Sequence, residues 1–447
     1  MPPQRTAISS RMIKGPSEGP SKGGDPGAVG RAVADIIAAV RARGDEAVRQ
    51  YSERFDHWAP ASFRLTQDEI AGAVARVPEQ VLADIRFVQQ QVRTMAERQL
   101  ASLTEFEIET LPGVHLGQKN IPISASAAYV PGGRYPMLAS AHMTIVTAKV
   151  AGVARVAAAT PPMDGAIPDT TVAGMALAGA DEIYILGGVQ AIAALAVGTN
   201  SIPKVDLIAG PGNGFVAEAK RQLYGEVGID LLAGPTEILI VADDRADPFL
   251  TAVDLLSQAE HGPDSPAVLI TTSEELGRAV LAHVDALLPL LPTHDNAGPA
   301  WRDHGEIHVV ATLSDAYALA DDFAFEHVQI FTREPREALE TMRHYGALFL
   351  GEGTCVPYGD KTIGTNHVLP TRGNARHSGG LWVGKFLRTV TYQEVTDRQA
   401  SSRLAEVTGR AARVEHFEGH ARSADARLAK YRGEAFDWVS AAGQHWH

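Results

Sequence analysis

Short apolar segments alternate with helix-like segments through the middle of the chain, and this alternation restricts the fold more than any other feature. Apolar segments at 127–130, 155–159, 182–186 and 205–209 indicate strands, with helical spacing between them. The same alternation returns after residue 258. Strands separated by helices at this spacing form parallel βαβ units with helices on both faces of the sheet. We therefore predict an α/β fold with two doubly wound, Rossmann-like domains.

The segments that flank these two halves have a different character. Residues 1–27 are rich in Pro, Gly and Ser and predict a flexible arm, whereas residues 28–125 have mainly helical spacing and predict an N-terminal helical module. The Rossmann-like domains are then expected at 126–250 and 251–385. The remaining residues, 386–447, predict a tail of one or two helices.

Charge and cysteine content exclude several classes of protein. The net charge of -13 argues against a nucleic-acid-binding surface, which needs clustered Lys and Arg. The single cysteine, Cys355, excludes an intramolecular disulfide and a cysteine-based zinc cluster, so we expect a reducing, cytoplasmic location. No cation near Cys355 in sequence would activate its thiol, so we interpret it as structural. The longest apolar stretch, 183–198, is interrupted by glycines and predicts no membrane span.

A carboxylate and an imidazole are adjacent in Glu326-His327, inside an apolar run. An apolar setting raises the pKa of a carboxylate and lowers that of a histidine, which moves both toward the neutral range where proton transfer is efficient. The pair would supply two separate acid–base roles in one active site. Taken alone, such a dipeptide is more often a surface or capping pair.

A glycine-rich turn follows the predicted strand at 205–209 and opens a helix. Its Gly212, Gly214 and Ala217 fit a relaxed dinucleotide fingerprint, in which backbone amides approach a pyrophosphate. A plain strand-to-helix turn explains the same residues equally well. No acidic residue that would bind a ribose follows at the usual distance, and Asp230 is a poor candidate. A second glycine turn precedes Gln190 at another strand end.

Gln258 and His261 lie three residues apart in a helical run, so their side chains leave one face of the helix. Histidine is a good zinc ligand, and a glutamine oxygen is an unusual but acceptable one. From spacing alone, a solvent-facing polar pair is the stronger interpretation. Asp360 and His420 would complete a mixed nitrogen and oxygen site, although nothing in their spacing shows that they meet.

Five motifs occur in order along the chain and together resemble the histidinol dehydrogenase family. They are Tyr129-Val130-Pro131-Gly132-Gly133, Gly210-Pro211-Gly212-Asn213, Ser257-Gln258-Ala259-Glu260-His261, Glu326-His327 and Gly364-Thr365-Asn366-His367-Val368-Leu369-Pro370-Thr371. The likeness runs from about Val29 to the C-terminal helices. Each motif is weak singly, and the ordered set is highly specific.

The resemblance implies a homodimeric enzyme that uses NAD and one zinc ion per subunit. Such an enzyme oxidises a primary alcohol to a carboxylate by two hydride transfers through a bound aldehyde, and its C-terminal tail reaches the site of the partner subunit. By motif, the zinc ligands are Gln258, His261, Asp360 and His420, which also contact the substrate, and the NAD contacts are Tyr129, Gln190 and Asn213.

The resemblance also assigns the acid–base roles. His327 would take the proton of the alcohol, and Glu326 would activate the water that attacks the aldehyde. Thr236, His327 and Glu415 match substrate contacts. In this family zinc mainly holds the substrate in place. A non-catalytic scaffold that kept the fold is an alternative, which the intact Glu326 and His327 disfavour.

Several residues depart from the histidinol dehydrogenase pattern around the substrate. Thr236 replaces the usual Ser, His142 a usual aliphatic residue and Lys385 a usual Asp. Glu415 is kept, whereas His416 and Phe417 after it are not typical. Arg372 and Arg376 follow the last of the five motifs closely.

These changes add positive or hydrogen-bond-donating groups near a pocket that holds a cationic amino alcohol in histidinol dehydrogenase. A pocket with more such groups favours an anionic ligand. The pattern resembles the branch of the family that contains sulfopropanediol dehydrogenase. We therefore expect a small anionic alcohol such as 2,3-dihydroxypropanesulfonate, with L-histidinol, in the last step of histidine biosynthesis, as the alternative.

Overall fold

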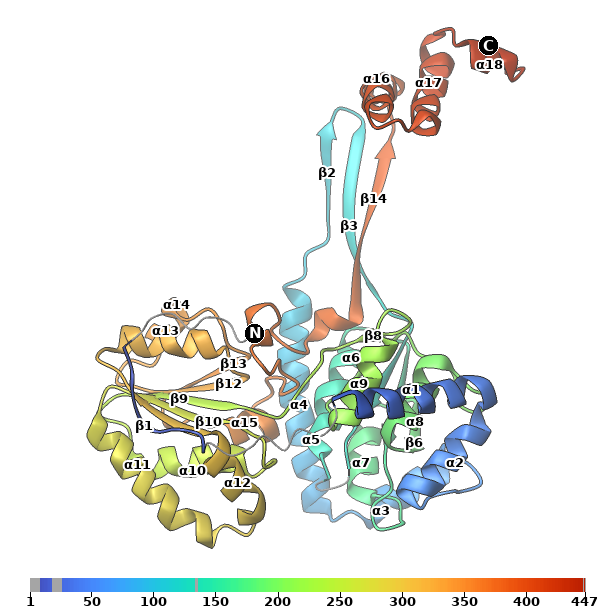
Figure 1. Ribbon diagram of the computed structural model, residues 1–447. Helices are drawn as coiled ribbons and strands as arrows, with labels where there is room; N and C mark the ends of the chain where they lie inside the picture. Colours follow the sequence, from blue (N-terminus) through green and yellow to red (C-terminus); the bar gives the residue numbers. More distant parts are fainter. Residues whose placement is uncertain (1–8, 18–25, 133–135, 445, 447) are drawn as a thin grey trace. The chain divides into compact units, whose positions relative to one another are not determined.

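The computed structural model describes residues 9–17, 26–132, 136–444 and 446. The chain divides into two compact units. The first comprises Met1–Leu100 and Pro122–Phe386, and the second comprises Ala101–Ile121 and Leu387–His447. The first unit contains two mainly parallel sheets with helices on their faces, which confirms the predicted α/β fold (Figure 1).

The first sheet has five parallel strands in the order β6-β5-β4-β7-β8. The strands are β4 (Ala125–Tyr129), β5 (Arg155–Thr160), β6 (Glu182–Ile185), β7 (Leu207–Ala209) and β8 (Gly228–Ile229). The chain builds outward from β4 in one direction through β5 and β6, then returns to place β7 on the other side of β4. Ligands of open α/β sheets bind at such a switch point, outside the carboxyl ends of the strands.

Helices follow the strands of the first sheet as predicted. They are α5 (Leu138–Ala141) and α6 (Thr147–Val150), joined by a π-helical turn at His142–Val146, then α7 (Asp169–Ala178), α8 (Gly188–Val197) and α9 (Gly214–Leu223). The apolar helix α8 is buried along almost its whole length, because it packs on the sheet with one face and against N-terminal helices with another.

The N-terminal helices are part of this first half and not a separate module. They are α1 (Pro26–Arg43), α2 (Asp45–Asp56), α3 (Gln67–Arg76) and α4 (Glu79–Ala101). Val33, Ile36 and Val40 of α1 share one hydrophobic core with Ile192 and Leu195 of α8. The sequence predicted a separate helical module at 28–125. The structure differs, because the apolar faces of α1 and α2 are buried against α8. Residues 101–121 belong to the second unit.

The second sheet has the order β1-β11-β10-β9-β12-β13. Its strands are β1 (Arg11–Lys14), β9 (Ile238–Ala242), β10 (Ala267–Thr271), β11 (Gly305–Val309), β12 (His327–Phe331) and β13 (Ala347–Leu350), all parallel except β1. Because β9 belongs to this sheet, the second half begins before the boundary expected at 250. All five residues of β9 are buried, and such a continuous apolar run lacks the alternation that marks an exposed strand.

The described part of the expected flexible arm, residues 9–17, contains strand β1, so the expectation was wrong for this part. Strand β1 pairs antiparallel with β11, and Lys14 Nζ donates a hydrogen bond to the Gly305 carbonyl at 2.6 Å. The strand thereby covers the edge of the sheet, whose backbone groups would otherwise be unpaired. Residues 1–8 and 18–25 of the expected arm lie outside the described residues.

Six helices surround the second sheet within the described residues. They are α10 (Pro248–Ala259), α11 (Glu274–Leu287), α12 (His294–His304), α13 (Leu313–Phe323), α14 (Glu337–Thr341) and α15 (Val356–Lys361). Alternate residues of β9 point into two separate cores, with Ile240 on one face and Leu239 and Val241 on the other. The sheet is therefore covered on both faces.

The second unit consists of a three-stranded sheet and a helical tail. Its strands are β2 (Phe106–Leu111), β3 (Val114–Pro122) and β14 (Leu387–Val395), and its helices are α16 (Arg398–Val414), α17 (Glu418–Arg432) and α18 (Asp437–Ala441). An ion pair between Arg413 and Asp425 joins α16 to α17. Exchange of this tail between subunits stays a prediction. None of the described helices has an apolar stretch of sufficient length to span a bilayer.

Candidate functional site

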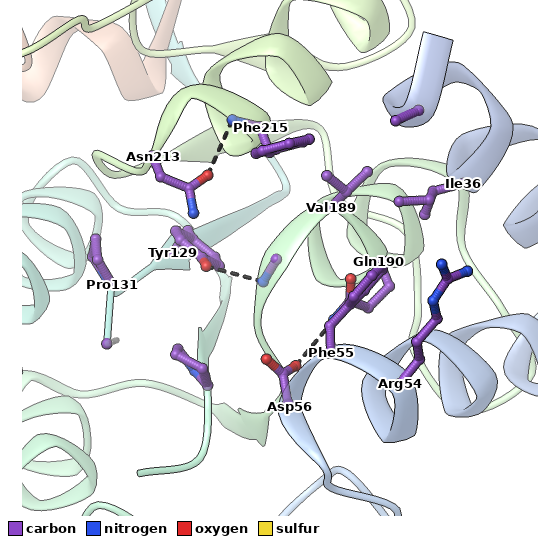
Figure 2. A pocket seen from close by; sticks show the side chains of 14 residues that line it. Ile36, Arg54, Phe55, Asp56, Tyr129, Pro131, Val189, Gln190, Asn213 and Phe215 are labelled. Atoms are coloured by element: carbon purple, nitrogen blue, oxygen red, sulfur yellow. Dashed lines mark hydrogen bonds between the residues drawn. The ribbon is translucent and has the colours of Figure 1, made fainter. Parts of the chain in front are cut away.

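The predicted cofactor residues Tyr129, Gln190 and Asn213 line one cavity of about 620 Å³ at the carboxyl edge of the first sheet (Figure 2). Tyr129 is the last residue of β4, and Gln190 and Asn213 follow β6 and β7. Most of the wall is apolar or aromatic, and its other lining residues are Ala32, Ile36, Arg54, Phe55, Asp56, Pro131, Gly132, Pro161, Gly188, Val189 and Phe215. Gly133 of the first motif lies outside the described residues.

Hydrogen bonds hold two of these side chains in place. The Tyr129 hydroxyl accepts a hydrogen bond from the backbone N–H of Gly188 at 3.0 Å, and burial raises the pKa of Tyr129 to about 12. Asn213 caps α9, because its Oδ1 accepts hydrogen bonds from Phe215 N–H at 3.0 Å and Val216 N–H at 3.1 Å. The cap uses the oxygen of the Asn213 amide and leaves its nitrogen for a ligand.

The residues present fit a dinucleotide. Helices α8 and α9 both begin at this cavity, and helix N-termini attract phosphate through their free N–H groups and positive dipole ends. A Cβ on Gly214 would meet nothing within 4 Å, so the backbone there is open to a ligand. Asp230 forms a buried ion pair with Lys220 and accepts the Gly210 N–H at 2.7 Å. It braces the glycine loop, in agreement with its rejection as a ribose ligand.

The predicted catalytic and metal residues of the first unit gather at the amino ends of β9 and β12. Thr236, His261, Glu326 and Asp360 line a cavity of about 190 Å³. A neighbouring cavity of about 190 Å³ is lined by Gln258 together with His261 and Asp360. Residues as distant in sequence as Thr236 and Asp360 therefore line the same cavity, which spacing could not show.

Hydrogen bonds orient the acid–base pair. Thr236 Oγ1 lies 2.7 Å from Glu326 Oε2 and 3.2 Å from Gln258 Oε1. His327 Nδ1 lies 3.1 Å from the Glu237 carbonyl oxygen, which only accepts, so Nδ1 carries a proton. The other ring nitrogen, Nε2, is buried, forms no hydrogen bond with any described residue and lies 3.8 Å from Asp360 Oδ1.

The electrostatics differ from the sequence-based expectation for His327. Burial lowers the pKa of His327, but the Glu326 carboxylate 3.4 Å from Nδ1 and the nearby Asp360 outweigh it and raise this pKa to about 9. The expected lowering was wrong because the surrounding run is apolar in sequence, whereas the ring faces carboxylates in space.

Glu237 is a neighbour that the sequence analysis missed. Burial raises the pKa of Glu237 to about 7, and its backbone N–H donates to Glu326 Oε2 at 3.2 Å. Its Oε1 accepts the Arg372 N–H at 2.8 Å. The signal in the sequence was its place beside Thr236, which gives two successive residues contact with the Glu326 carboxylate.

Three of the four predicted zinc ligands fit a cation site. Gln258 and Asp360 are buried, and burial lowers the pKa of His261, which favours the neutral imidazole that a metal needs. Gln258 lies in the last turn of α10, where the helix dipole is negative. Among the described residues, no group of three or more His, Cys, Asp or Glu side chains could hold a metal ion; Gln258 is not one of these residue types.

The remaining two predicted site residues, Glu415 and His420, lie in the second unit. Glu415 follows the last turn of α16, and His420 lies in the first turn of α17 with its ring centroid 5.2 Å from that of Phe417. Their roles stay predictions. His367, which was not predicted as a site residue, donates from Nδ1 to the Asp360 carbonyl at 3.2 Å. Its place in the last of the five motifs was the signal.

The cationic groups expected around the substrate are mostly elsewhere. His142 is buried, its Nδ1 accepts a hydrogen bond from Gln89, and burial lowers its pKa to about 4, so it carries no charge. Lys385 does not line the cavities described above. Arg376 donates to the Asp322 carbonyl at 2.6 Å. Of the expected groups, only Arg372 lines a neighbouring cleft of about 1030 Å³, which also reaches His261.

Cys355 lies just before α15 and is half-buried. Burial raises the pKa of its thiol, so the thiolate that attacks an aldehyde is disfavoured. The structure agrees with the interpretation of Cys355 as structural.

Comparison with known proteins gives one consistent family. The family described as histidinol dehydrogenase matches residues 22–428. A histidinol dehydrogenase homolog from Shouchella clausii is 55% identical over 405 residues, which are 91% of this chain and 95% of the relative. A sulfopropanediol 3-dehydrogenase from Ruegeria pomeroyi is 46% identical over 417 residues, 92% of this chain and 95% of the relative.

A solved structure supports the same relationship. The crystal structure of histidinol dehydrogenase from Elizabethkingia anophelis superposes with a TM-score of 0.85 at 31% identity and covers 90% of this chain and 92% of that one. Members of this family are in general NAD-dependent, zinc-binding dehydrogenases. With a family match across most of its length and close relatives covered almost completely, the chain belongs to the histidinol dehydrogenase family.

Proposed function

We propose that the protein is a zinc- and NAD-dependent dehydrogenase that oxidises a primary alcohol through an aldehyde to a carboxylate, with two NAD per turnover. The observation that carries the proposal is the buried, unbonded Nε2 of His327 beside the anchored Glu326 carboxylate. The substrate we propose is a small anionic alcohol such as 2,3-dihydroxypropanesulfonate. The 46% identity to a sulfopropanediol 3-dehydrogenase supports this choice.

We propose that His327 accepts the proton of the alcohol. Its Nδ1–H is held by the Glu237 carbonyl, so in the neutral ring the lone pair belongs to Nε2, which has no hydrogen-bond partner among the described residues. Because the pKa of His327 is raised to about 9, this neutral form is favoured at alkaline pH. As Nε2 takes the hydroxyl proton, the carbon that carries this hydroxyl would lose a hydride to NAD, and an aldehyde would form. The carboxylates that raise the pKa of His327 stabilise the imidazolium formed in this step.

We propose that Glu326 activates water for the second oxidation. Thr236 and the Glu237 N–H contact Oε2 of its carboxylate, which leaves Oε1 to take a proton from water as that water attacks the aldehyde carbon. The hydrate anion formed in this way would then lose a hydride to a second NAD and become the carboxylic acid. The two donors hold the carboxylate through Oε2 and leave Oε1 without a bond to either of them.

Gln258, His261 and Asp360 would hold zinc, with His420 supplied by the tail of the partner subunit in a homodimer. The bound metal would supply a template that orients the substrate oxygen. Thr236 Oγ1 lies 3.2 Å from Gln258 Oε1 and also contacts Glu326, so the Thr236 hydroxyl lies between a proposed metal ligand and Glu326. The substrate contact proposed for Glu415 also depends on the tail.

Arg372 supports an anionic substrate. Its backbone lies in the left-handed region with φ 57°, and its N–H is bonded to Glu237, so the residue is held beside the catalytic carboxylates. A Cβ on Gly234 would be 2.6 Å from Arg372 Nε, which shows how closely the guanidinium stem packs there. No described residue forms an ion pair with its guanidinium, whose planar fork suits a sulfonate.

L-Histidinol is the second candidate, because a carboxylate such as Glu415 suits the amino group of that substrate. The test is the amount of NADH formed per mole of limiting alcohol by zinc-loaded protein. We expect about two per mole of the matching enantiomer of 2,3-dihydroxypropanesulfonate, as four-electron oxidation requires, and none from L-histidinol. Two NADH per mole of L-histidinol would establish the second candidate. No zinc uptake and no NADH from either alcohol would support a non-catalytic scaffold.

A matched pair of variants tests the part played by Arg372. Arg372→Gln removes the guanidinium that lines the cleft, and we expect KM for the sulfonate to rise roughly tenfold or more while the zinc content stays unchanged. Arg376→Gln removes the same charge four residues away, where the side chain is bonded to Asp322. Equal effects of the two variants would show that the cleft has no dedicated anion contact at Arg372.

A further inference from the structure

The cofactor cavity contains an acidic residue that no sequence motif marks. Asp56 is the only acidic residue among the described residues that line it (Figure 2). It comes from α2, far in sequence from the glycine turns after β6 and β7 that shape the rest of the cavity. A dinucleotide fingerprint places its ribose-binding acid about twenty residues after the glycine turn. In this protein the acidic residue at the cavity, Asp56, comes from α2 and not from the segment after a glycine turn.

The position of Asp56 is fixed by its surroundings. It is the last residue of α2, and the chain then turns through His57 in the left-handed conformation. Ser52 holds this turn, since its hydroxyl donates to the Trp58 carbonyl at 2.7 Å. Gln190, itself buried, donates from Nε2 to Asp56 Oδ2 at 3.0 Å. The carboxylate therefore presents its second oxygen, Oδ1, from a rigid end of a helix.

The chemistry of the cavity distinguishes between ligands at this point. Within the described residues, no lysine or arginine forms an ion pair with Asp56. Burial raises the pKa of Asp56, and the hydrogen bond from Gln190 and the neighbouring His57 oppose this only in part, so further donors would stabilise its charged form. The hydroxyls of a ribose are such donors. A phosphate group at the same place would bring negative charge against a partly buried carboxylate.

We propose that Asp56 selects NAD over NADP by accepting hydrogen bonds from the hydroxyls of the adenosine ribose and repelling a 2′-phosphate. The aromatic side chains Phe55 and Phe215 line the same cavity and suit the flat face of adenine. The N-termini of α8 and α9 suit the pyrophosphate on the other side of that ribose. The inference rests on the NAD dependence in the proposed function.

Arg54 determines how NADP affinity is expected to change when the charge of Asp56 is removed. It lines the same cavity and its guanidinium carbon lies 5.2 Å from the centre of the Phe55 ring. A guanidinium attracts a 2′-phosphate, so Asp56 and Arg54 act in opposite directions on NADP. Removing the Asp56 charge leaves the attraction by Arg54 unopposed. NADP binding is then expected to strengthen in absolute terms, while NAD binding weakens.

The experiment is calorimetric titration of NAD and NADP into the full-length protein without alcohol. We expect wild type to bind NAD more tightly, and Asp56→Asn to lower the ratio of NAD to NADP affinity at least about tenfold. Glu53→Gln is the matched control, because it removes one exposed charge from the same helix outside the cavity. Titration with 5′-AMP and adenosine 2′,5′-bisphosphate shows the same change if discrimination is at the adenosine ribose.

Three outcomes would overturn the inference. An unchanged affinity ratio in Asp56→Asn, with NAD still bound and the melting temperature kept, would remove Asp56 as the selecting residue and leave the proposed function in place. An equal change in Glu53→Gln would show a general charge effect. Failure of wild type to bind either dinucleotide would remove the proposed NAD dependence and this inference with it.

Discussion

The two halves of the first unit use opposite edges of their sheets. Tyr129, Gln190 and Asn213 lie at the carboxyl ends of the first sheet, where open α/β sheets usually bind ligands. Thr236 and Glu326 lie just before β9 and β12, at the amino ends of the second sheet. The same fold class thus provides two kinds of site, and the choice of edge determines which chemical groups are available.

The difference is electrostatic as well as topological. At the first edge the helices α8 and α9 begin, so their positive ends face the cavity. At the second edge α10 and α13 end, so carbonyl groups and negative dipole ends face the site. The first edge suits the phosphates of a dinucleotide, and the second suits a metal ion and an imidazolium. The predictions for His327 and Lys220 below test whether the two edges act independently.

The largest expected effect is at the amino edge of the second sheet, where we propose that the oxidation takes place. His327→Ala removes the acceptor Nε2, and we expect alcohol oxidation to fall by roughly 10³- to 10⁴-fold because no other group takes the hydroxyl proton. Oxidation of the corresponding aldehyde is expected to survive in part. NADH formation from alcohol and from aldehyde, measured separately, gives the two rates. NAD affinity is the control and is expected to stay unchanged, and an equal loss in both steps would refute the division of roles.

Glu326→Gln is expected to affect the other step. The amide keeps the contact with Thr236 but cannot take a proton from water, so aldehyde oxidation should fall by roughly 10²- to 10³-fold. The yield of NADH per mole of alcohol would then approach one, with free aldehyde trapped by a hydrazine reagent. A yield that stays near two at every time point would contradict the assignment of water activation to Glu326.

A third change tests the cofactor edge alone. Lys220→Met leaves the buried Asp230 carboxylate without its cation, and we expect the free energy of unfolding to fall by about 3–5 kcal/mol. Because Asp230 and Lys220 both bond to Gly210, the loop that presents Asn213 should loosen and NAD affinity should decrease. Urea unfolding and NAD titration measure the two effects. Zinc content serves as the control, and its loss would show that the edges are coupled.

The sequence predicted the α/β class and most elements, because apolar strands and helical spacing are local patterns. It missed β9, which is apolar throughout, and β1, whose pairing partner is almost 300 residues away. The site residues came from the resemblance, since hydrogen bonds such as that between Thr236 and Glu326 join distant positions. The charge states of the site residues depend on burial and on neighbouring charges, which the sequence does not show. His142 was expected to add a positive group and is instead neutral inside the protein.

The smallest expected effect concerns this histidine, which begins the π-helical turn between α5 and α6. Burial and the nearby His367 lower the pKa of His142 to about 4 in the folded state, whereas an unfolded histidine has a pKa of 6.5. The unfolded chain therefore binds more protons between these values, and the free energy of unfolding should fall as pH falls from 6.5 to 4. The contribution of His142 approaches about 3 kcal/mol below pH 4. His142→Leu should remove it, whereas His57→Leu, at an exposed position, should not, and urea unfolding at several pH values measures the difference.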